Sequence, residues 1–424
     1  MPYQQALTID VPVKAEQLEA LRQLLEQMGQ DAANNAVLPL GNLPGTHFAR
    51  LLILDRSTDQ AGKVIPASLI FISECDAPLD RYMERLVDAH SEGLDRIFSF
   101  CEGYPAGPQL NRASRLAFLQ ARSIKTAAFY VNTVGRTVEQ VRQEARLREA
   151  IENYLDSRSD WGEMQPLQVR AEIQNYLRSQ PEFSWASRPA AGPSLFFRLR
   201  EALHLVAFPL VALLLAPFAL LLLPIFLVIL RIKEMTDPVD NLKPTPDHIR
   251  ELAALEDKVV QNQFSAVGYI KPGWFRQLIV MVVLLGVDWV VRHIFNNGNL
   301  AGVKTIHFAR WVTLNENRWV IFTSNYDGSL ESYMDDFIDK VAWGLNGVFS
   351  NGVGYPKTDF LVMGGAQNEQ AFKNYLRRHQ IPTQVWYSAY HNLSTLNISQ
   401  NSRIRAGLNS NMNSAQAEEW LSLL

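Results

Sequence analysis

Apolar and polar residues alternate along two pairs of segments, one pair near each end of the chain, and an amphipathic helix follows each pair. The pairs are 47–54 with 68–74 and 306–313 with 319–325. Alternation with a period of two is typical of β-strands, whereas apolar residues three and four positions apart are typical of a helix. The helix after the second pair carries a continuous apolar stripe, formed by Leu330, Tyr333, Met334, Phe337, Ile338, Val341 and Leu345.

The two regions also share residues, which indicates an internal duplication. From Ile70 and Ile321 onward the sequences align without a gap as far as Gly103-Tyr104-Pro105 and Gly354-Tyr355-Pro356. Matches that extend over a strand, a helix and a closing turn do not arise from shared composition alone, so we interpret them as two copies of one unit.

Each copy is expected to follow the order β-α-β-β-α-β, which is the ferredoxin-like split βαβ arrangement. We therefore predict an α+β fold in which two ferredoxin-like repeats form a pseudo-dimeric α+β barrel, with a hydrophobic membrane-associated insertion between them. A further aromatic strand is expected at 384–389. The other segments that this order requires are strands 7–13 and 264–270, helices 14–28 and 275–295, and fourth strands 126–132 and 360–363.

This interpretation divides the chain into five segments. They are repeat one at 1–155, a linker at 156–200, a hydrophobic membrane segment at 201–232, a second linker at 233–262, and repeat two at 263–424.

The membrane segment contains an uncharged apolar block, 202–230, that Pro209, Pro217 and Pro224 interrupt. It is longer than the roughly 20 residues that span a bilayer. If the two repeats pack together, they lie on one side of the membrane, and a single crossing between them would separate them. As a hairpin bent at Pro217, each arm would rise about 21 Å, short of the ~30 Å hydrocarbon core. The block is therefore expected to dip into the membrane and return.

Two alternatives remain open for the block. One is a single long kinked span, and the other is a pair of spans that uses 278–291 as the second. A buried core helix that also touches lipid is the competing interpretation of 278–291. Basic residues flank the block on both sides, which predicts that the bulk of the chain lies on the cytoplasmic side of the membrane. These residues are Arg198, Arg200, Arg231 and Lys233.

Composition narrows the class of protein only a little. The chain has 424 residues and a formal net charge of −3, which excludes a generally basic protein that coats nucleic acid. Its first residues have neither a basic nor an apolar stretch, so no cleaved signal peptide is expected there. Two cysteines, Cys75 and Cys101, are too few for a disulfide framework and are expected to be reduced thiols.

At IHFARW, SNYDGSLESYMDDFIDK and PTQVWYSAY the chain resembles an uncharacterised family of bacterial membrane-associated proteins, over about residues 271–408. That resemblance implies membrane association and no particular activity. At the level of fold, the paired repeats resemble dimeric α+β barrel proteins, which include dye-decolourising haem peroxidases, chlorite dismutases and small monooxygenases. The peroxidase signature Gly-x-x-Asp-Gly has its nearest match at 324–328, SNYDG, which lacks the first glycine, and repeat one has SECDA at 73–77.

The barrel resemblance implies haem as a candidate cofactor, and it directs attention to the polar residues of the second hairpin. Counting back from the hairpin tip, 315–317, places His307 opposite Asn325 to within one residue, with Asp327 at the same end. The predicted catalytic residues are His307, Arg310 and Asp327. The predicted cofactor-binding residues are His307, Arg310, Asn325, Tyr326, His47 and Arg50.

Each of these residues also has a structural interpretation. A histidine at a strand end often makes structural hydrogen bonds, and an arginine can pair with a carboxylate of its own repeat. Asp327 and Asp76 precede helices, where a carboxylate accepts backbone N–H bonds of the first turn. His307 and Arg310 should lie on opposite faces of their strand, because side chains alternate, so only one of them is expected to face a cavity.

The predicted function is therefore a membrane-associated protein that binds a small hydrophobic molecule, as an oxidoreductase of the haem peroxidase type. The alternative is a non-catalytic membrane protein that binds lipid or a partner, or that organises the membrane. No metal-binding or nucleotide-binding motif is present in the sequence. The expected partners are membrane lipid and a hydrophobic ligand, without nucleic acid.

Overall fold

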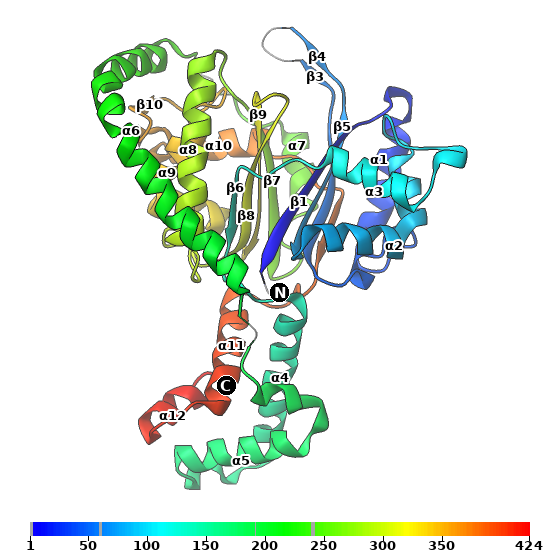
Figure 1. Ribbon diagram of the computed structural model, residues 1–424, viewed down its shortest axis with the longest axis vertical. Coiled ribbons are helices and arrows are strands. Elements are labelled where there is room, and N and C mark those ends of the chain that lie inside the picture. The colour runs from blue at the N-terminus through cyan, green and yellow to red at the C-terminus, as the bar shows by residue number, and fades with distance from the viewer. Residues whose placement is uncertain (1–2, 59–61, 191, 239–241) are drawn as a thin grey trace.

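A computed structural model describes residues 3–58, 62–190, 192–238 and 242–424. Two four-stranded antiparallel sheets face each other, helices cover the outer face of each sheet, and a helical projection leaves one end (Figure 1). The fold is thus mixed α+β with antiparallel sheets, as predicted. Residues 1–2, 59–61, 191 and 239–241, which fall in the predicted first repeat and the two predicted linkers, lie outside the described residues.

Each sheet takes three strands from one half of the chain and its fourth strand from the other half. The first sheet has the order β1 (Gln4–Pro12), β5 (Ser68–Asp76), β2 (Thr46–Leu54) and β12 (Val385–Ser388). The second sheet has the order β6 (Ala128–Val131), β8 (Ile306–Leu314), β9 (Trp319–Asp327) and β7 (Gln261–Tyr269).

The fourth strand of each sheet differs from the predicted one. The strand expected at 126–132 is present as β6, but it pairs with β8 in the second sheet. Residues 360–363 lie largely in the turn between two short strands, β10 (Thr358–Asp359) and β11 (Met363–Gly364). The aromatic strand β12 pairs with β2 in the first sheet. Alternation within a strand shows that it belongs to a sheet, and it does not say which sheet edge the strand joins.

Both faces of each sheet are buried, because helices cover one face and the other sheet covers the second. In β2, Ala49 and Leu51 pack toward the helices, whereas Leu52 packs with Val312 of β8 between the sheets. The helices over the first sheet are α1 (Leu18–Gly29), α2 (Leu79–Phe98) and α3 (Arg112–Arg122). Those over the second are α8 (Trp274–His293), α9 (Leu330–Phe349) and α10 (Glu369–His379).

Four helices form the projection, which we call the stalk (Figure 1). They share an apolar core that includes Leu147, Ile173, Ile404 and Trp420. The predicted linker 156–200 is therefore largely packed structure rather than a free connection. The stalk helices are α4 (Val138–Asp156), α5 (Pro166–Ser179), α11 (Thr395–Asn409) and α12 (Ser414–Leu421), with the 3-10 turns η4 (Asp160–Glu163) and η5 (Pro181–Ser187).

Several short elements connect the sheets and the larger helices. They are β3 (Ser57–Thr58), β4 (Val64–Ile65), α7 (Pro246–Ala253), and the 3-10 turns η1 (Ala15–Gln17), η2 (Leu40–Asn42), η3 (Gly107–Gln109) and η6 (Gly365–Gln367).

The apolar block is part of one continuous helix, α6 (Leu195–Thr236), of 42 residues. It is antiparallel to α8 and touches it near both ends: His204 contacts His293, and Leu230 packs against Phe275. As a straight helix, 204–230 would extend about 40 Å, whereas 275–293 of α8 extends about 27 Å. The α6 helix therefore bows away from α8 between these contacts, as Figure 1 shows.

The three prolines lie within this bowed segment, where missing backbone hydrogen bonds allow a helix to bend. The expected hairpin with a turn at Pro217 is thus replaced by a curved helix. The expected return of the chain to the same body is present, because both ends of α6 contact it. By length and composition, α6 and α8 are each long and apolar enough to cross a membrane.

Candidate functional site

Two buried arginines connect the sheets in opposite directions. Arg50 of β2 reaches the second sheet, where Nη1 donates to the Phe264 carbonyl at 2.9 Å and to Ser265 Oγ at 2.8 Å. Its Nη2 donates to the Ser324 carbonyl at 3.0 Å and to Asn325 Oδ1 at 2.6 Å. Burial lowers the pKa of Arg50 to about 10, against the opposing effect of the Glu74 carboxylate.

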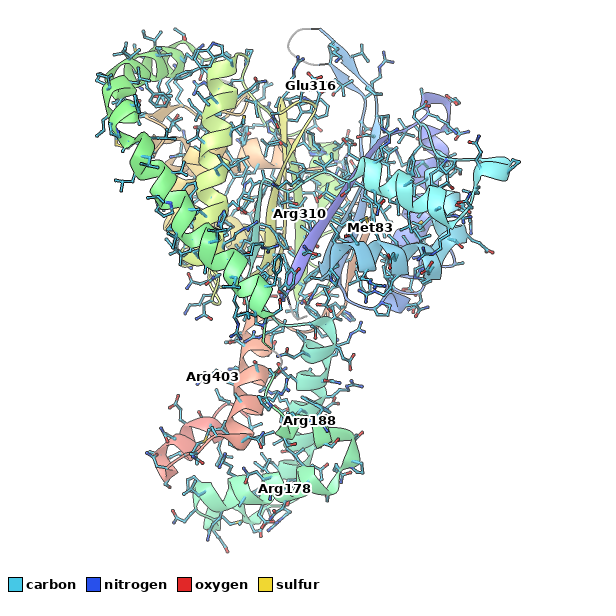
Figure 2. The ribbon with its side chains drawn as sticks, viewed as in Figure 1. Met83, Arg178, Arg188, Arg310, Glu316 and Arg403 are labelled. Atoms are coloured by element: carbon cyan, nitrogen blue, oxygen red, sulfur yellow. The ribbon has the colours of Figure 1, made fainter. Side chains whose placement is uncertain are left out.

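Arg310 of β8 makes the corresponding contacts with the first sheet, and Figure 2 shows it between the sheets. Its Nη1 donates to the Leu7 carbonyl at 2.7 Å and to Thr8 Oγ1 at 3.1 Å. Its Nη2 donates to the Ser73 carbonyl at 2.9 Å and to Glu74 Oε1 at 2.5 Å. The expectation that each arginine pairs with a carboxylate of its own repeat is wrong, because the partners lie in the opposite sheet.

The predicted pair His307 and Asp327 is brought together. His307 Nε2 lies 2.7 Å from Asp327 Oδ1. The other oxygen, Oδ2, accepts from the backbone N–H and the hydroxyl of Thr395, at 2.8 and 2.9 Å, at the start of α11. Asp327 therefore does not cap the helix that follows it, which Ser329 caps instead. Asp327 instead fixes the stalk helix α11 to the second sheet.

The first half contains the same arrangement. His47 Nε2 lies 3.0 Å from Asp76 Oδ1, and His47 Nδ1 lies 2.8 Å from the Tyr390 hydroxyl. Asp76 Oδ2 accepts from the backbone N–H of Val138, 3.2 Å away, at the start of α4. Each His–Asp pair thus joins a sheet to one stalk helix, and both nitrogens of His47 already have partners.

A β-bulge explains where His307 lies. The register of β8 against β9 shifts between Ile306 and Phe308, so Phe308 rather than His307 pairs with Asn325. A bulge re-aims a side chain. The His307 ring therefore reaches Phe48 of the other sheet, with ring centroids 5.4 Å apart, although Arg310 also points between the sheets. The expectation that only one of the two faces this space is wrong.

Asn325 and Tyr326 complete the predicted set and lie apart from each other. Asn325 Oδ1 accepts from Arg50 and, at 3.0 Å, from the Trp386 indole N–H. Tyr326 stacks on Tyr333 of α9, with ring centroids 3.9 Å apart, on the helix-covered side of its sheet. Tyr326 is therefore not part of the group around His307.

The space beside the two histidines does not fit haem. A cavity of about 30 Å³ lies there, lined by His47, His307 and Tyr390 among others. Pockets that hold ligands of cofactor size occupy roughly 300–1,000 Å³. Aromatic rings fill the remaining space, and the arginine Nη donors are bonded to the opposite sheet. Among the described residues, no group of three His, Cys, Asp or Glu side chains could hold a metal ion.

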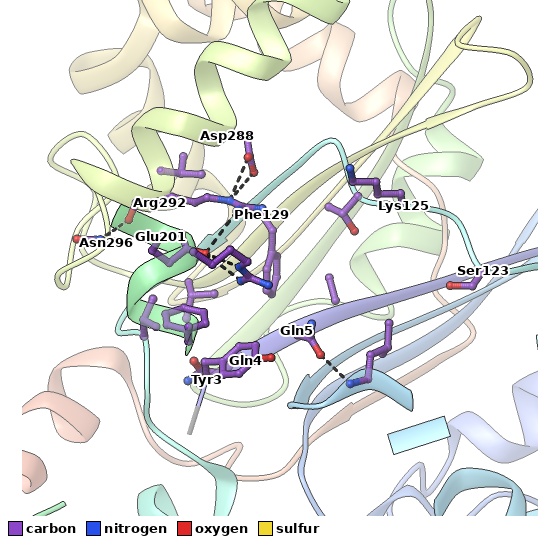
Figure 3. Close-up of a pocket in the computed structure, with 18 of the residues that line it drawn as sticks. Tyr3, Gln4, Gln5, Ser123, Lys125, Phe129, Glu201, Asp288, Arg292 and Asn296 are labelled. Atoms are coloured by element: carbon purple, nitrogen blue, oxygen red, sulfur yellow. Dashed lines mark hydrogen bonds and ion pairs between the residues drawn. The ribbon is translucent and has the colours of Figure 1, made fainter. Parts of the chain in front are cut away.

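A larger cleft, of about 710 Å³, lies elsewhere, where the edge of β1 meets the chain leading into β6, the start of α6 and the end of α8 (Figure 3). Its apolar lining includes Met83, Phe129, Val131 and Val134. Charged side chains of the two helices form its rim. The rim is a chain of ion pairs: Arg200 with Glu201 at 2.9 Å, Glu201 with Arg292 at 3.7 Å, and Arg292 with Asp288 at 3.0 Å.

Helix α6 has two faces at the cleft. Phe197, Arg200 and Glu201 line the cleft at helical spacing. On the other face Phe196 and Leu203 are 76% and 70% exposed. One side of the same two turns therefore faces a partly polar cavity, and the other side is an apolar surface without protein cover in the described chain.

Sequence reasoning missed this cleft because its lining comes from five separate stretches of chain and contains no motif. The available signals were the charges at the ends of the apolar segments: Arg200 before the block, and Asp288 and Arg292 within 275–295. Pattern analysis assigns such charges to flanks and helix faces, and only the fold brings them together.

No protein family, curated protein or solved structure matches the chain in comparisons with known proteins. The resemblances to a membrane-associated family and to α+β barrel proteins therefore stay predictions.

Proposed function

We propose that this protein attaches to one face of a membrane through α6 and binds an amphipathic molecule from that membrane in the cleft. The observation that carries the proposal is the two-faced start of α6, which lines the cleft on one side and presents apolar side chains on the other. A lipid that lies along the outer face of α6 then needs only a short movement to place its polar end in the cleft.

The exposure of apolar side chains along the bowed segment of α6 supports membrane attachment. Burying one large apolar side chain contributes roughly 1.5–3 kcal/mol, and soluble proteins rarely expose a continuous apolar surface of this extent. The neighbouring outer face of α8 adds Leu278, Met281, Val282 and Leu285. The exposed large apolar residues of the bowed segment are Leu205, Val206, Leu210, Val211, Leu213, Leu214, Leu215, Phe218, Leu220, Leu221, Leu222, Leu223, Ile225, Val228 and Ile229.

Attachment without crossing is the arrangement that the contacts favour. The inner face of α8, which includes Val280 and Leu284, packs into the core of the second sheet. A bilayer crossing by α8 would draw strands with polar side chains into hydrocarbon. The α6 helix is held to the same body at both ends, so its bowed segment enters one leaflet and returns. The basic flanks of α6 favour the cytoplasmic face.

We also propose that the two sheets are halves of a pseudo-dimeric α+β barrel, built from duplicated ferredoxin-like units that exchange their fourth strands. The paired contacts of Arg50 and Arg310 support this relation. A second pair is Gln4 and Gln261, whose amides donate to the loops that precede α4 and α11, at 2.6 Å and 2.5 Å for the closest carbonyls. Helices α2 and α9 also depart from helical geometry at corresponding positions, His90 and Val341. These residues are 251 positions apart, as are Ile70 and Ile321.

Binding is favoured over catalysis. The oxidoreductase hypothesis depends on resemblance of fold, which does not carry function by itself. The His–Asp pairs and the arginines have structural partners, whereas the cleft offers space of ligand size.

The test combines vesicle flotation with mass spectrometry of lipid that the purified protein retains. Leu213→Asp with Leu221→Asp should abolish flotation, because each carboxylate would have to enter the bilayer. Val134→Trp, which fills the cleft, should keep flotation and lose most of the retained lipid. Val64→Trp, at an exposed position on β4, is the matched control. Unchanged lipid in the Val134→Trp protein would overturn the cleft as the binding site.

A further inference from the structure

We propose that the cleft selects a zwitterionic phospholipid headgroup, with its phosphate beside Lys125 and its ammonium group beside Asp80. This inference rests on the proposed function and names the ligand class of the same cleft. It follows from the charges that line the cavity, the uncommitted hydrogen-bond donors beside Lys125, and the carboxylate that lies beside the corresponding residue of the second half.

The ionised side chains that line the cleft balance each other. Four of the charges are the ion-paired rim residues, two arginines and two carboxylates. The other two are Lys125, from the chain that leads into β6, and Asp80, from the first turn of α2. Both are exposed, and neither makes an ion pair within the described residues. One free charge of each sign suits a ligand that also carries one of each.

The stretch around Lys125 is suited to a phosphate. Ser123 and Thr126 line the same part of the cleft, and the Thr126 hydroxyl is buried without a hydrogen-bond partner in the described chain. Figure 3 shows Ser123 and Lys125 along this wall. A phosphate oxygen accepts strong hydrogen bonds from an ammonium group and from hydroxyls. Asp80 supplies the opposite charge for a primary ammonium group.

The rim disfavours a headgroup with net negative charge. Glu201 and Asp288 are mostly buried at the cleft, with side chains 19% and 14% exposed. Their charges are matched by Arg200 and Arg292 of the same rim. An anionic headgroup such as phosphatidylglycerol has a phosphate but no ammonium group. It would leave Asp80 without a compensating charge and bring a net negative charge near the rim carboxylates, which is disfavoured.

The second half of the chain contains a residue that corresponds to Ser123. Ser123 bridges Ile9 of β1, and Gln380 bridges Ala266 of β7 in the same way, which makes the two positions correspond in the proposed duplication. The Glu256 carboxylate lies beside Gln380. Its Oε1 accepts from Gln380 Nε2 at 2.6 Å and from Arg377 Nη1 at 2.7 Å. An anionic acceptor thus lies beside the residue that corresponds to Ser123.

The experiment measures headgroup selection by the full-length protein. Protein is reconstituted in vesicles of equal parts phosphatidylethanolamine and phosphatidylglycerol, re-extracted in detergent, and analysed for retained lipid by mass spectrometry. We expect phosphatidylethanolamine to be enriched at least about threefold, the effect of one exposed ion pair of under 1 kcal/mol.

Two charge variants and one control define the outcome. Asp80→Asn should remove the enrichment and raise the share of phosphatidylglycerol, whereas Lys125→Gln should lower retention of both lipids. Glu418→Gln, at an exposed position on α12, should match the unmodified protein. Retained lipid with the composition of the vesicles, in the unmodified protein, would overturn the headgroup inference and leave the proposed function intact. Absence of retained lipid would overturn both.

Discussion

The guanidinium groups of Arg50 and Arg310 cross the space between the two sheets in opposite directions, and within the described residues only that of Arg310 meets a carboxylate. Each donates to backbone carbonyls of the facing sheet, so each arginine fixes the position of one sheet relative to the other. The partner at the matching position is Asn325 for Arg50 and Glu74 for Arg310. This difference makes the two arginines a natural comparison of a neutral and an ionic contact.

Arg310→Met should destabilise the protein more than Arg50→Met. The first variant leaves the buried Glu74 carboxylate without its partner, which typically costs about 3–5 kcal/mol. The second leaves only neutral acceptors unpaired, which costs about 1–3 kcal/mol. Chemical unfolding in detergent, followed by tryptophan fluorescence, measures both. Adding Glu74→Gln to Arg310→Met should restore part of the loss, and equal losses in the two single variants would contradict the ionic role of Glu74.

The His–Asp pairs should hold the stalk to the sheets. Asp327→Asn removes the charge that accepts from the N-terminus of α11 and from His307, and should lower the free energy of unfolding by about 1–3 kcal/mol. Hydrogen exchange should rise first at the start of α11. Asp339→Asn, at an exposed position on α9, is the control. Uniform exchange across the chain, without a local effect at α11, would contradict this role.

The exchanged strands should hold the halves together after the chain is cut. A protease site placed after η5, at 188–190, divides the chain at exposed residues. Because β6 lies in the second sheet and β12 in the first, the fragments should elute as one species in detergent at native pH. Elution as two separate folded fragments would rule out the exchange.

Purified protein should show no Soret absorbance, even from cells supplied with haem, because the cavity of about 30 Å³ beside His307 is too small for the cofactor. His307→Ala should leave the absorbance spectrum unchanged and lower only stability. A stoichiometric Soret band that disappears in His307→Ala would restore the peroxidase hypothesis. The measurement is the absorbance spectrum of the unmodified protein and of the His307→Ala protein, purified in parallel.

Local pattern was enough for the individual elements. The paired hairpins, the helix stripe that includes Tyr333 and Met334, and the uncharged block 202–230 are all visible in the sequence, because periodicity reflects which side of an element is buried. The contact between His307 and Asp327 could also be predicted from the sequence, because both residues lie near one end of a single hairpin. Contacts within one hairpin depend on chain positions that are close in sequence.

Only the tertiary structure decided which sheet β6 and β12 join, which backbone the two arginines bind, and where the cleft lies. A strand has the same alternating pattern whichever edge it joins, and an arginine that binds backbone carbonyls needs no particular residue type opposite. The bow of α6 depends on contacts between segments that are distant in the sequence. Composition and spacing describe one segment at a time, so features that arise where several segments meet are decided by packing.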